Sequence, residues 1–258
     1  MSRLKSIFER AKAQGRAVFM PYFTAGYPDL PRSPQYLEAV ARHADIVELG
    51  LPFSDPIADG PTIQKSSEQA LRSGITPRIT LQLAAQMRQR YAGGLVIMSY
   101  MNPILTYGPQ AFARDAAQAG VDGLIVPDLP PEEADEVLSA AQASGLDLSF
   151  LVAPTSTPPR IRAAARGSGF LYAVSVTGVT GMRDSLPPEL AAMIQLIRQH
   201  CSLPVAVGFG VATSAQARQI AQLADGVIVG SALIERAKQG PVALAELCAE
   251  LARALTPG

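Results

Sequence analysis

Residues 45–64, DIVELGLPFSDPIADGPTIQ, give the clearest indication of the fold. It starts with a short apolar run, DIVELG, continues through a loop rich in Pro and Gly, and reaches a point where a helix is expected to begin, at Pro61. An apolar run without alternating polar residues is typical of a strand that is buried on both faces, as in a parallel sheet. The stretch therefore predicts one unit of strand, loop and helix.

Seven more apolar runs of this kind occur along the chain. They are AVFMPYF (17–23), LVIMSY (95–100), GLIVPD (123–128), LSFLVAP (148–154), FLYAVSV (170–176), LPVAVGFG (203–210) and GVIVG (226–230). Stretches with helical spacing lie between them, such as ITLQLAAQMRQRYA (79–92), EEADEVLSAAQASG (132–145) and PELAAMIQLIRQH (188–200). Eight strand–helix units without a break in composition favour an α/β fold, a closed (β/α)8 TIM barrel. An open doubly wound sheet is the alternative.

The barrel is expected to form a single domain over residues 1–258, because barrels of this class need about 250 residues. The first fifteen residues, MSRLKSIFERAKAQG, predict an extra N-terminal helix that caps the bottom of the barrel. The segment VALAELCAELARAL (242–255) predicts a final helix packed on the outside. With 48% hydrophobic residues, the chain can bury a large core.

Charge and cysteine content narrow the class of function. The formal net charge is +0 and the basic residues are scattered, so neither nucleic acid nor an anionic membrane is an expected partner. The first residues lack the apolar core of a signal peptide, and no apolar run has the length of a membrane span, so we expect a cytoplasmic protein. Cys201 and Cys248 are unclustered and predict neither a disulfide nor a metal site.

Polar residues at the ends of the predicted strands are the first candidates for a site, because catalytic groups in barrels project from the carboxyl ends of strands. This rule selects Glu48, Tyr100, Asn102 and Asp128. Residues in the interior of each apolar run are expected to form the core.

Glu48 and Asp59 form a candidate acid–base pair. Burial of Glu48 among Ile, Val and Leu raises its pKa and favours a proton donor, whereas Asp59 on the following loop can stay ionised. Alternatively, Glu48 pairs with a buried arginine and Asp59 caps the helix that begins at Pro61. Asp55, which precedes a proline, is expected to shape the loop.

Three late segments are suited to binding an anion through backbone N–H groups: TGVTG (177–181), GFG (208–210) and VGSA (229–232). Each follows a predicted strand, and the loops after the seventh and eighth strands are a frequent phosphate site in barrels. The alternative is that these glycines only form tight turns. A dinucleotide fingerprint is disfavoured because Thr213 stands where the third glycine is needed.

Seven motifs together resemble the tryptophan synthase α subunit family. They are PYFTAGYPD (21–29), ELGLPFSDPIADGPTIQ (48–64), SYMNPILTYG (99–108), VPDLP (126–130), VSVTGVTG (174–181), GFG and GSA (230–232), and they run in the family's order over nearly the whole chain. The resemblance implies a TIM barrel lyase that cleaves indole-3-glycerol phosphate to indole and glyceraldehyde 3-phosphate in tryptophan biosynthesis. It implies no cofactor or metal in this chain, and a pyridoxal-phosphate-bearing β subunit as partner in an α2β2 heterotetramer.

The same resemblance assigns roles to individual residues. Glu48 and Asp59 correspond to the two catalytic carboxylates. Tyr22, Tyr100, Leu151, Tyr172 and Phe209 would line the indole pocket, while Gly181, Gly210, Gly230 and Ser231 would bind the phosphate. Asp55, Asp128 and Thr180 are expected to act in loop closure and coupling to the partner. Two departures concern loop contacts: Tyr22 and Val176 stand where some members have Phe and Arg.

The chemistry requires protonation of indole C3 before its bond to the glycerol chain can break. Glu48 is the expected acid, Asp59 the group that holds the ring N–H, and ionised Glu48 then takes the proton of the chain hydroxyl. No lysine falls at a predicted strand end to form a Schiff base, and His43 and His200 lie far apart and outside every motif.

Three rival functions make different demands on the sequence. Another phosphosugar barrel enzyme, an epimerase or decarboxylase, would need metal ligands or a catalytic lysine at strand ends. A non-catalytic subunit that only regulates its partner predicts the loss of one of the paired carboxylates, and both are present. A stand-alone lyase that releases indole stays open.

Overall fold

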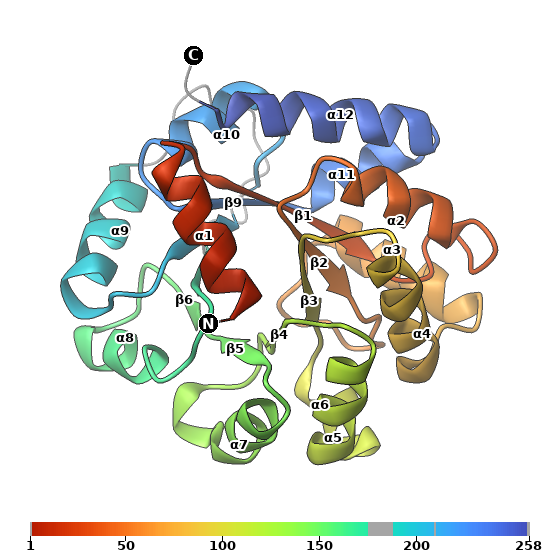
Figure 1. Ribbon diagram of the computed structural model, residues 1–258, viewed down its shortest axis with the longest axis horizontal. Helices are drawn as coiled ribbons and strands as arrows, with labels where there is room; N and C mark the ends of the chain where they lie inside the picture. The colour runs from red at the N-terminus through yellow and green to blue at the C-terminus, as the bar shows by residue number, and fades with distance from the viewer. Residues whose placement is uncertain (1, 175–187, 209, 257–258) are drawn as a thin grey trace.

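The computed structural model describes residues 2–174, 188–208 and 210–256, and its centre is a ring of parallel strands (Figure 1). The strands are β1 (Val18–Thr24), β2 (Ile46–Gly50), β3 (Gly94–Met98), β4 (Gly123–Ile125), β5 (Asp147–Ser149), β6 (Leu151–Val152), β7 (Leu171–Val174), β8 (Val205–Gly208) and β9 (Gly226–Val229). Their order in the sheet is β5-β4-β3-β2-β1-β9-β8-β7-β6. The two strands at the ends of this order, β5 and β6, are separated by a single residue in the chain. The two edges of the sheet therefore meet there.

The expected (β/α)8 barrel is confirmed, with one difference in its fifth strand. The predicted run at 148–154 is divided into β5 and β6, which meet at Phe150. The carbonyl oxygen of Phe150 accepts a hydrogen bond from the Tyr172 N–H at 3.0 Å, so pairing continues from the break into β7. One broken strand therefore closes the barrel.

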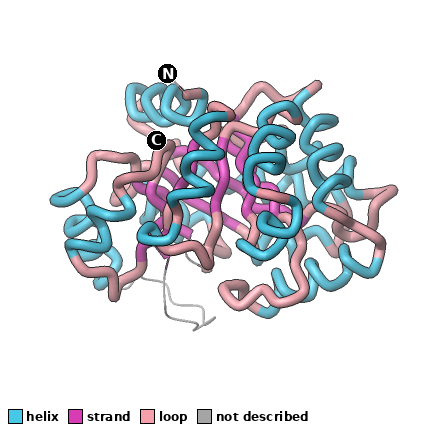
Figure 2. The backbone as a smooth tube through the Cα atoms, turned by 90° about the horizontal axis from the view of Figure 1, so that it is seen from below, coloured by secondary structure: helices cyan, strands magenta, loops and turns pink. Residues whose placement is uncertain are grey.

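Helices surround the strands on the outside (Figures 1 and 2). They are α2 (Ser33–Ala41), α3 (Pro61–Arg72), α4 (Pro77–Arg88), α5 (Met101–Tyr107), α6 (Pro109–Gln118), the 3-10 helix η1 (Pro131–Glu133), α7 (Asp135–Ala143), α8 (Pro158–Ala164), α9 (Pro188–His200), α10 (Ser214–Ala221), α11 (Ser231–Ala237) and α12 (Pro241–Ala254). The expected helix at 188–200 has the predicted bounds, and the final helix lies outside as predicted.

The extra N-terminal helix, α1 (Arg3–Ala13), lies across one end of the barrel, as expected (Figure 2). Its apolar side chains Leu4, Ile7 and Phe8 join a buried cluster with inward-facing strand residues such as Met20 and Ile228. A Cβ atom at Gly94 would stand 2.8 Å from Leu4, so the first residue of β3 must be small for α1 to approach. The helix therefore closes the amino-terminal end of the strands and leaves their carboxyl ends for a site.

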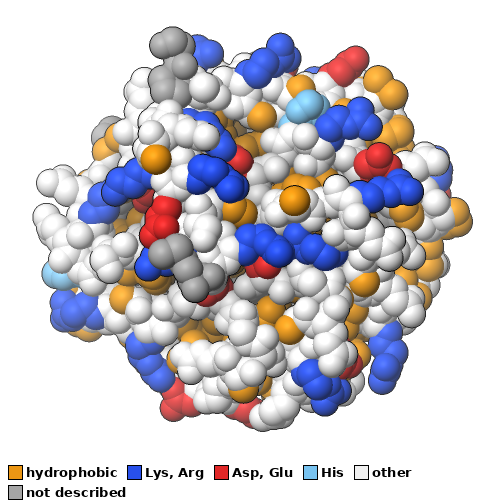
Figure 3. Space-filling model, in the orientation of Figure 1, with side chains coloured by type: hydrophobic (Ala, Val, Ile, Leu, Met, Phe, Trp, Pro, Cys, Tyr) orange, Lys and Arg blue, Asp and Glu red, His pale blue; other side chains and the backbone are white. Residues whose placement is uncertain are grey.

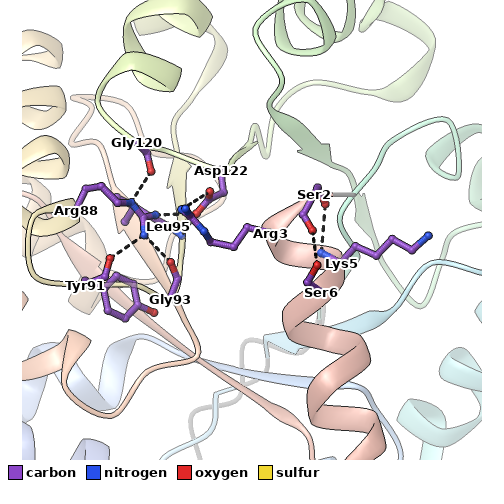
Figure 4. A network of polar contacts seen from close by, with 10 residues as sticks. All are labelled: Ser2, Arg3, Lys5, Ser6, Arg88, Tyr91, Gly93, Leu95, Gly120 and Asp122. Carbon is purple, nitrogen blue, oxygen red and sulfur yellow. Dashed lines mark hydrogen bonds and ion pairs between the residues drawn. The ribbon is translucent and has the colours of Figure 1, made fainter.

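The amino-terminal ends of the strands are tied together by a repeated side-chain hydrogen bond. Asp122, just before β4, accepts from the Leu95 N–H of β3 at 2.8 Å and returns its own N–H to the Leu95 carbonyl at 2.7 Å. Arg88 and Arg3 bind the same carboxylate at 2.7 and 2.8 Å (Figure 4). The same reciprocal pairing joins the residues Asp45 with Phe19, Ser168 with Leu148, and Asp225 with Val205.

The face that carries α1 shows Lys and Arg side chains spread among acidic and apolar ones (Figure 3). Among the described residues, no helix combines the length and the apolar character that crossing a membrane requires.

Candidate active site

Glu48 lies in the middle of β2 and its side chain is 0% exposed. Neither carboxyl oxygen has a hydrogen-bond partner among the described residues, which removes the alternative of a buried arginine pair within that part of the chain. Burial, followed by the negative charge of Asp59, raises the pKa of Glu48 to about 8. The carboxyl group is therefore a proton donor at neutral pH, since an unpaired charge in this position is costly.

Asp59 lies on the loop between β2 and α3, and its backbone holds the turn. Its N–H donates to the Pro56 carbonyl at 3.0 Å, and its own carbonyl accepts from Gln64 Nε2 at 2.9 Å. Helix α3 begins with Gly60 as its N-cap, so Asp59 is not the cap that the alternative interpretation required. Burial raises the pKa of Asp59 to about 6, and hydrogen bonding to Tyr100 opposes that rise.

Two tyrosines from different strands of the barrel lie near these carboxyls. Tyr22 of β1 is the register partner of Glu48, and Tyr172 of β7 is the partner of Leu151. Glu48 and Asp59 both raise the pKa of each phenol, in addition to the larger effect of burial. Tyr22, Tyr172 and the two carboxyls therefore share one region of the barrel.

Glycines in neighbouring strands make the space for these two rings. A Cβ atom at Gly50 would stand 2.1 Å from the Tyr22 hydroxyl oxygen, and one at Gly208 would stand 2.5 Å from the Tyr172 ring. Real Cβ atoms do not approach so closely, so both strand positions exclude any larger residue. The side chains of Leu151, Tyr172 and Met98 pack on the inner cluster below.

Tyr100 connects the loop of Asp59 to the end of β3. Its hydroxyl accepts a hydrogen bond from the Ala58 N–H at 3.0 Å. The Phe53 ring lies against it, with the centroids 5.5 Å apart. Sequence reasoning did not select Phe53, although an aromatic residue five positions after Glu48 in the same loop is a usable signal.

The candidate phosphate residues lie on neighbouring connections. Gly210 follows β8, Gly230 follows β9, and these two strands are paired. Gly210 has a φ of +35°, and Gly230 is the N-cap of α11, which begins at Ser231. Thr213 is the N-cap of α10 in a capping box with Gln216, which accounts for a threonine where a dinucleotide site has glycine. Val176, Thr180, Gly181 and Phe209 lie outside the described residues.

Asp55, Asp128 and Asn102 make local contacts of their own or lie on the surface. Asp55 accepts a hydrogen bond from Ser54 Oγ at 2.5 Å, and its backbone carbonyl accepts from the Ile57 N–H. Asp128 accepts from the Met101 N–H at 2.9 Å, at the first turn of α5. Asn102 is exposed on α5, so the strand end that the sequence suggested there is a short helix instead.

These residues bring two carboxyls of different pKa together with the aromatic side chains of Tyr22, Tyr172 and Tyr100. A protonated Glu48 can give a proton to a carbon or oxygen atom, while Asp59 is largely ionised at neutral pH and can hold an N–H donor. The arrangement suits acid–base cleavage of an aromatic substrate.

Comparison with known proteins identifies the family. The family model described as tryptophan synthase alpha chain matches residues 8–255. The tryptophan synthase alpha chain of Deinococcus radiodurans is 51% identical over 242 residues, which is 93% of this chain and 90% of that one. The tryptophan synthase alpha chain of Geobacter sp. strain M21 is 51% identical over 237 residues, covering 91% and 89% of the two chains.

Solved structures agree with the sequence relatives. A chain of Mycobacterium tuberculosis tryptophan synthase superposes with a TM-score of 0.94 at 45% identity, covering 100% of this chain and 99% of that one. Tryptophan synthase subunit alpha from Legionella pneumophila superposes with a TM-score of 0.91 at 37% identity, covering 99% and 98%. The chain belongs to the tryptophan synthase alpha chain family.

Proposed function

We propose that Glu48 and Asp59 carry out the reaction of this family, the retro-aldol cleavage of indole-3-glycerol phosphate to indole and glyceraldehyde 3-phosphate. As a member of the family, the chain is a carbon–carbon lyase of tryptophan biosynthesis. The single observation that carries these roles is the buried Glu48 carboxyl, which has no hydrogen-bond partner among the described residues and whose pKa is raised to about 8 by burial and, to a lesser extent, by the charge of Asp59.

The mechanism follows from the two pKa values. Glu48 gives its proton to indole C3, which turns a poor leaving group into an indolenine. Asp59 accepts the hydrogen bond of the ring N–H and stabilises the positive charge that develops there. Ionised Glu48 then takes the proton of the glycerol hydroxyl beside the breaking bond, the carbon–carbon bond opens, and the electron pair returns to the indole ring. The aldehyde forms on the other fragment.

The indole ring is assigned to the space between Tyr22, Tyr172 and Leu151, near Tyr100. Phe209 is proposed to complete that pocket. The phosphate is assigned to the backbone N–H groups of Gly210, Gly230 and Ser231 with Gly181, because glycine lets the main chain approach an anion closely. An apolar end and an anionic end on one face of the barrel match the two ends of the substrate.

The mechanism is tested by running the cleavage in deuterium oxide with the purified chain. Indole and glyceraldehyde 3-phosphate should form in equal amounts, and each indole should carry deuterium at C3, because the added proton comes from an exchangeable carboxyl. Mass spectrometry of the indole measures this directly. Indole without deuterium at C3 would remove the proposed acid step.

We infer that the partner is a β subunit carrying pyridoxal phosphate, that it receives the indole, and that the assembly is α2β2. Support for this inference comes from exposed apolar side chains at the carboxyl ends of the strands. Ile57, on the Asp59 loop, is 82% exposed, and Leu105 of α5 is 51% exposed, so both offer apolar surface that a partner could cover. A partner that covers this face would also hold Asp59 in position and exclude water from the two carboxyls. Asp55, Asp128 and Thr180 are proposed to couple closure to that partner.

Linkage gives the test of the partner. A non-reacting substrate analogue must tighten β-subunit binding by the same factor by which the β subunit tightens the analogue, with a coupling of roughly 1–3 kcal/mol. Calorimetry with and without saturating β subunit measures both factors, and Asp55→Ala should weaken the coupling. Equal analogue affinities in every case would favour a stand-alone lyase.

A further inference from the structure

A chain of hydroxyl groups leads away from the site beside Glu48. The Tyr22 hydroxyl lies 3.3 Å from Thr24 Oγ1, which lies 2.6 Å from Ser66 Oγ on α3. Ser66 Oγ in turn donates to the Ile63 carbonyl at 2.8 Å. Thr24 is 0% exposed and Ser66 is 1% exposed, so water does not supply alternative partners. The hydroxyls must satisfy one another.

The direction of this chain is fixed by counting protons. The Ile63 carbonyl can only accept, so Ser66 spends its single proton there. Ser66 must then accept from Thr24, and Thr24, whose proton is committed to Ser66, must accept from Tyr22. The phenol proton of Tyr22 therefore points at Thr24 and along β1.

Tyr22 is at the same time a close neighbour of the proposed acid. It pairs in register with Glu48 on the adjacent strand, and its hydroxyl stands directly over Gly50, where a Cβ atom would be 2.1 Å away. Gly50 is two positions after Glu48, so both point to the same face of β2. The phenol is also near enough for the charge of Glu48 to raise its pKa, yet neither Glu48 oxygen receives a hydrogen bond from the described residues.

We propose that Thr24 and Ser66 withhold the Tyr22 proton from Glu48, and that they are positioning residues which keep Glu48 a proton donor. The proposal rests on the proposed role of Glu48 as the acid. A hydrogen bond donated to a carboxylate favours its ionised form, so a Tyr22 proton directed at Glu48 would weaken the acid. The hydroxyl chain lets the pocket contain a phenol without that cost.

The other groups around Glu48 do not replace this control. In the described part of the chain, Asp59 from the loop raises the pKa of Glu48, and Glu48 in turn raises the pKa of Tyr22 from β1 and of Tyr172 from β7. On the β3 side, the register partner of Glu48 is the apolar Val96. Asp59 opposes ionisation of Glu48, whereas Tyr22 is the phenol beside it in register and the one whose proton is directed by Thr24.

The test is the titration of Glu48 in ligand-free protein carrying ¹³C-labelled glutamate carboxyls, with its signal assigned by comparison with Glu48→Gln. Thr24→Val removes the acceptor, so the Tyr22 proton turns to Glu48 and the measured pKa should fall by about 1–2 units, the size expected for a hydrogen bond to a charged group. Thr24→Ser keeps the hydroxyl and should keep the wild-type value. The double variant Tyr22→Phe with Thr24→Val has no phenol proton and should match Tyr22→Phe alone.

Each result of these titrations either supports or overturns the proposal. A fall in the Glu48 pKa that requires both the loss of Thr24 and the presence of Tyr22 supports the proposal. An unchanged or raised pKa in Thr24→Val, or the same fall when Thr24→Val is added to Tyr22→Phe, overturns it. If Thr24→Val does not yield folded protein, as judged by its circular dichroism, Thr24→Ala is measured in the same way. Because no turnover is needed, this result is independent of whether Glu48 is the acid, which the activity of Glu48→Gln decides.

Discussion

The hydroxyl oxygen of Tyr100 accepts a hydrogen bond from the Ala58 N–H at 3.0 Å, and so fixes the residue that precedes Asp59. The contact joins the end of β3 to the loop after β2. The same hydroxyl is hydrogen bonded to the Asp59 carboxyl and lowers its pKa, which burial alone would raise further. One phenol therefore both positions the second carboxylate and keeps it ionised.

Tyr100→Phe should lower turnover by about 10- to 100-fold, the loss expected when one hydrogen bond to a charged group is removed. The fold should stay intact, because the Phe53 ring still has an aromatic ring to pack against. The pH at which Asp59 becomes ionised should rise at the same time. Steady-state indole release between pH 5 and 9 measures both effects. Tyr91→Phe is the matched control, since the Tyr91 hydroxyl donates to the carbonyl of Ala44, which precedes β2. Equal activity of the two variants would contradict the role of Tyr100.

The rate of cleavage should follow a bell-shaped pH profile. Asp59 must be ionised, so activity is lost as the pH falls below about 6. Glu48 must be protonated, so activity is lost as the pH rises above about 8. The two limbs belong to the pair, because each carboxyl responds to the other. In Asp59→Asn the charge that raises the Glu48 pKa is absent, so the residual activity of that variant should decline at a lower pH on the basic side. A basic limb that stays in place would show that Glu48 does not titrate beside Asp59.

Gly230→Ala tests the phosphate assignment with a single added methyl group. The φ of Gly230, −122°, is negative, and the new Cβ would stand 3.4 Å from Tyr22, which is ordinary contact. Gly210 is less suitable, because its φ of +35° disfavours any side chain. The added methyl group should keep the phosphate from the backbone and weaken glycerol 3-phosphate binding about tenfold or more. Calorimetry gives the affinity and thermal melting the stability. Unchanged affinity would place the phosphate elsewhere.

Asp122→Ala should destabilise the barrel by about 2–4 kcal/mol, because it leaves Arg88 without its buried carboxylate and the Leu95 N–H without its acceptor. Glu68→Ala is the control: it breaks an exposed ion pair with Arg72 and should cost under about 1 kcal/mol. Urea unfolding measures both. The activity of folded Asp122→Ala should stay near that of the wild type, since the network lies at the opposite end of the strands. Equal stability of the two variants would contradict the importance of the network.

Much of the fold could be predicted because a strand that is buried on both faces appears in the sequence as a short, continuous apolar run. Each apolar run became a strand, and Pro61 and Pro188 begin helices where the sequence indicated. The break at Phe150 and the short helix α5 were not predicted, because both depend on how the strands close. The bond from Leu95 to Asp122 joins residues 27 positions apart, which no local pattern reveals.

The carboxyl pair was also within reach of the sequence, because an acidic residue inside an apolar strand is costly unless it is used. The sequence could not predict in which direction the Tyr22 hydroxyl donates its proton. The partner of the Tyr22 hydroxyl proved to be Thr24, and Ser66 completes that chain from 42 residues away. Such a network depends on the packing of α3 against β1. The assigned roles of Thr180, Gly181 and Phe209 stay predictions, as these residues lie outside the described part of the chain.

Indole release from indole-3-glycerol phosphate by folded Glu48→Gln and Asp59→Asn tests the roles of the two carboxyls. Both substitutions keep the shape of the side chain and remove its proton transfer or its charge, so each should lower turnover by about 10²- to 10⁴-fold. Glu68→Gln, the same change on an exposed side chain of α3, should leave turnover at the wild-type level. Near wild-type turnover in either Glu48→Gln or Asp59→Asn would contradict the two-carboxylate mechanism.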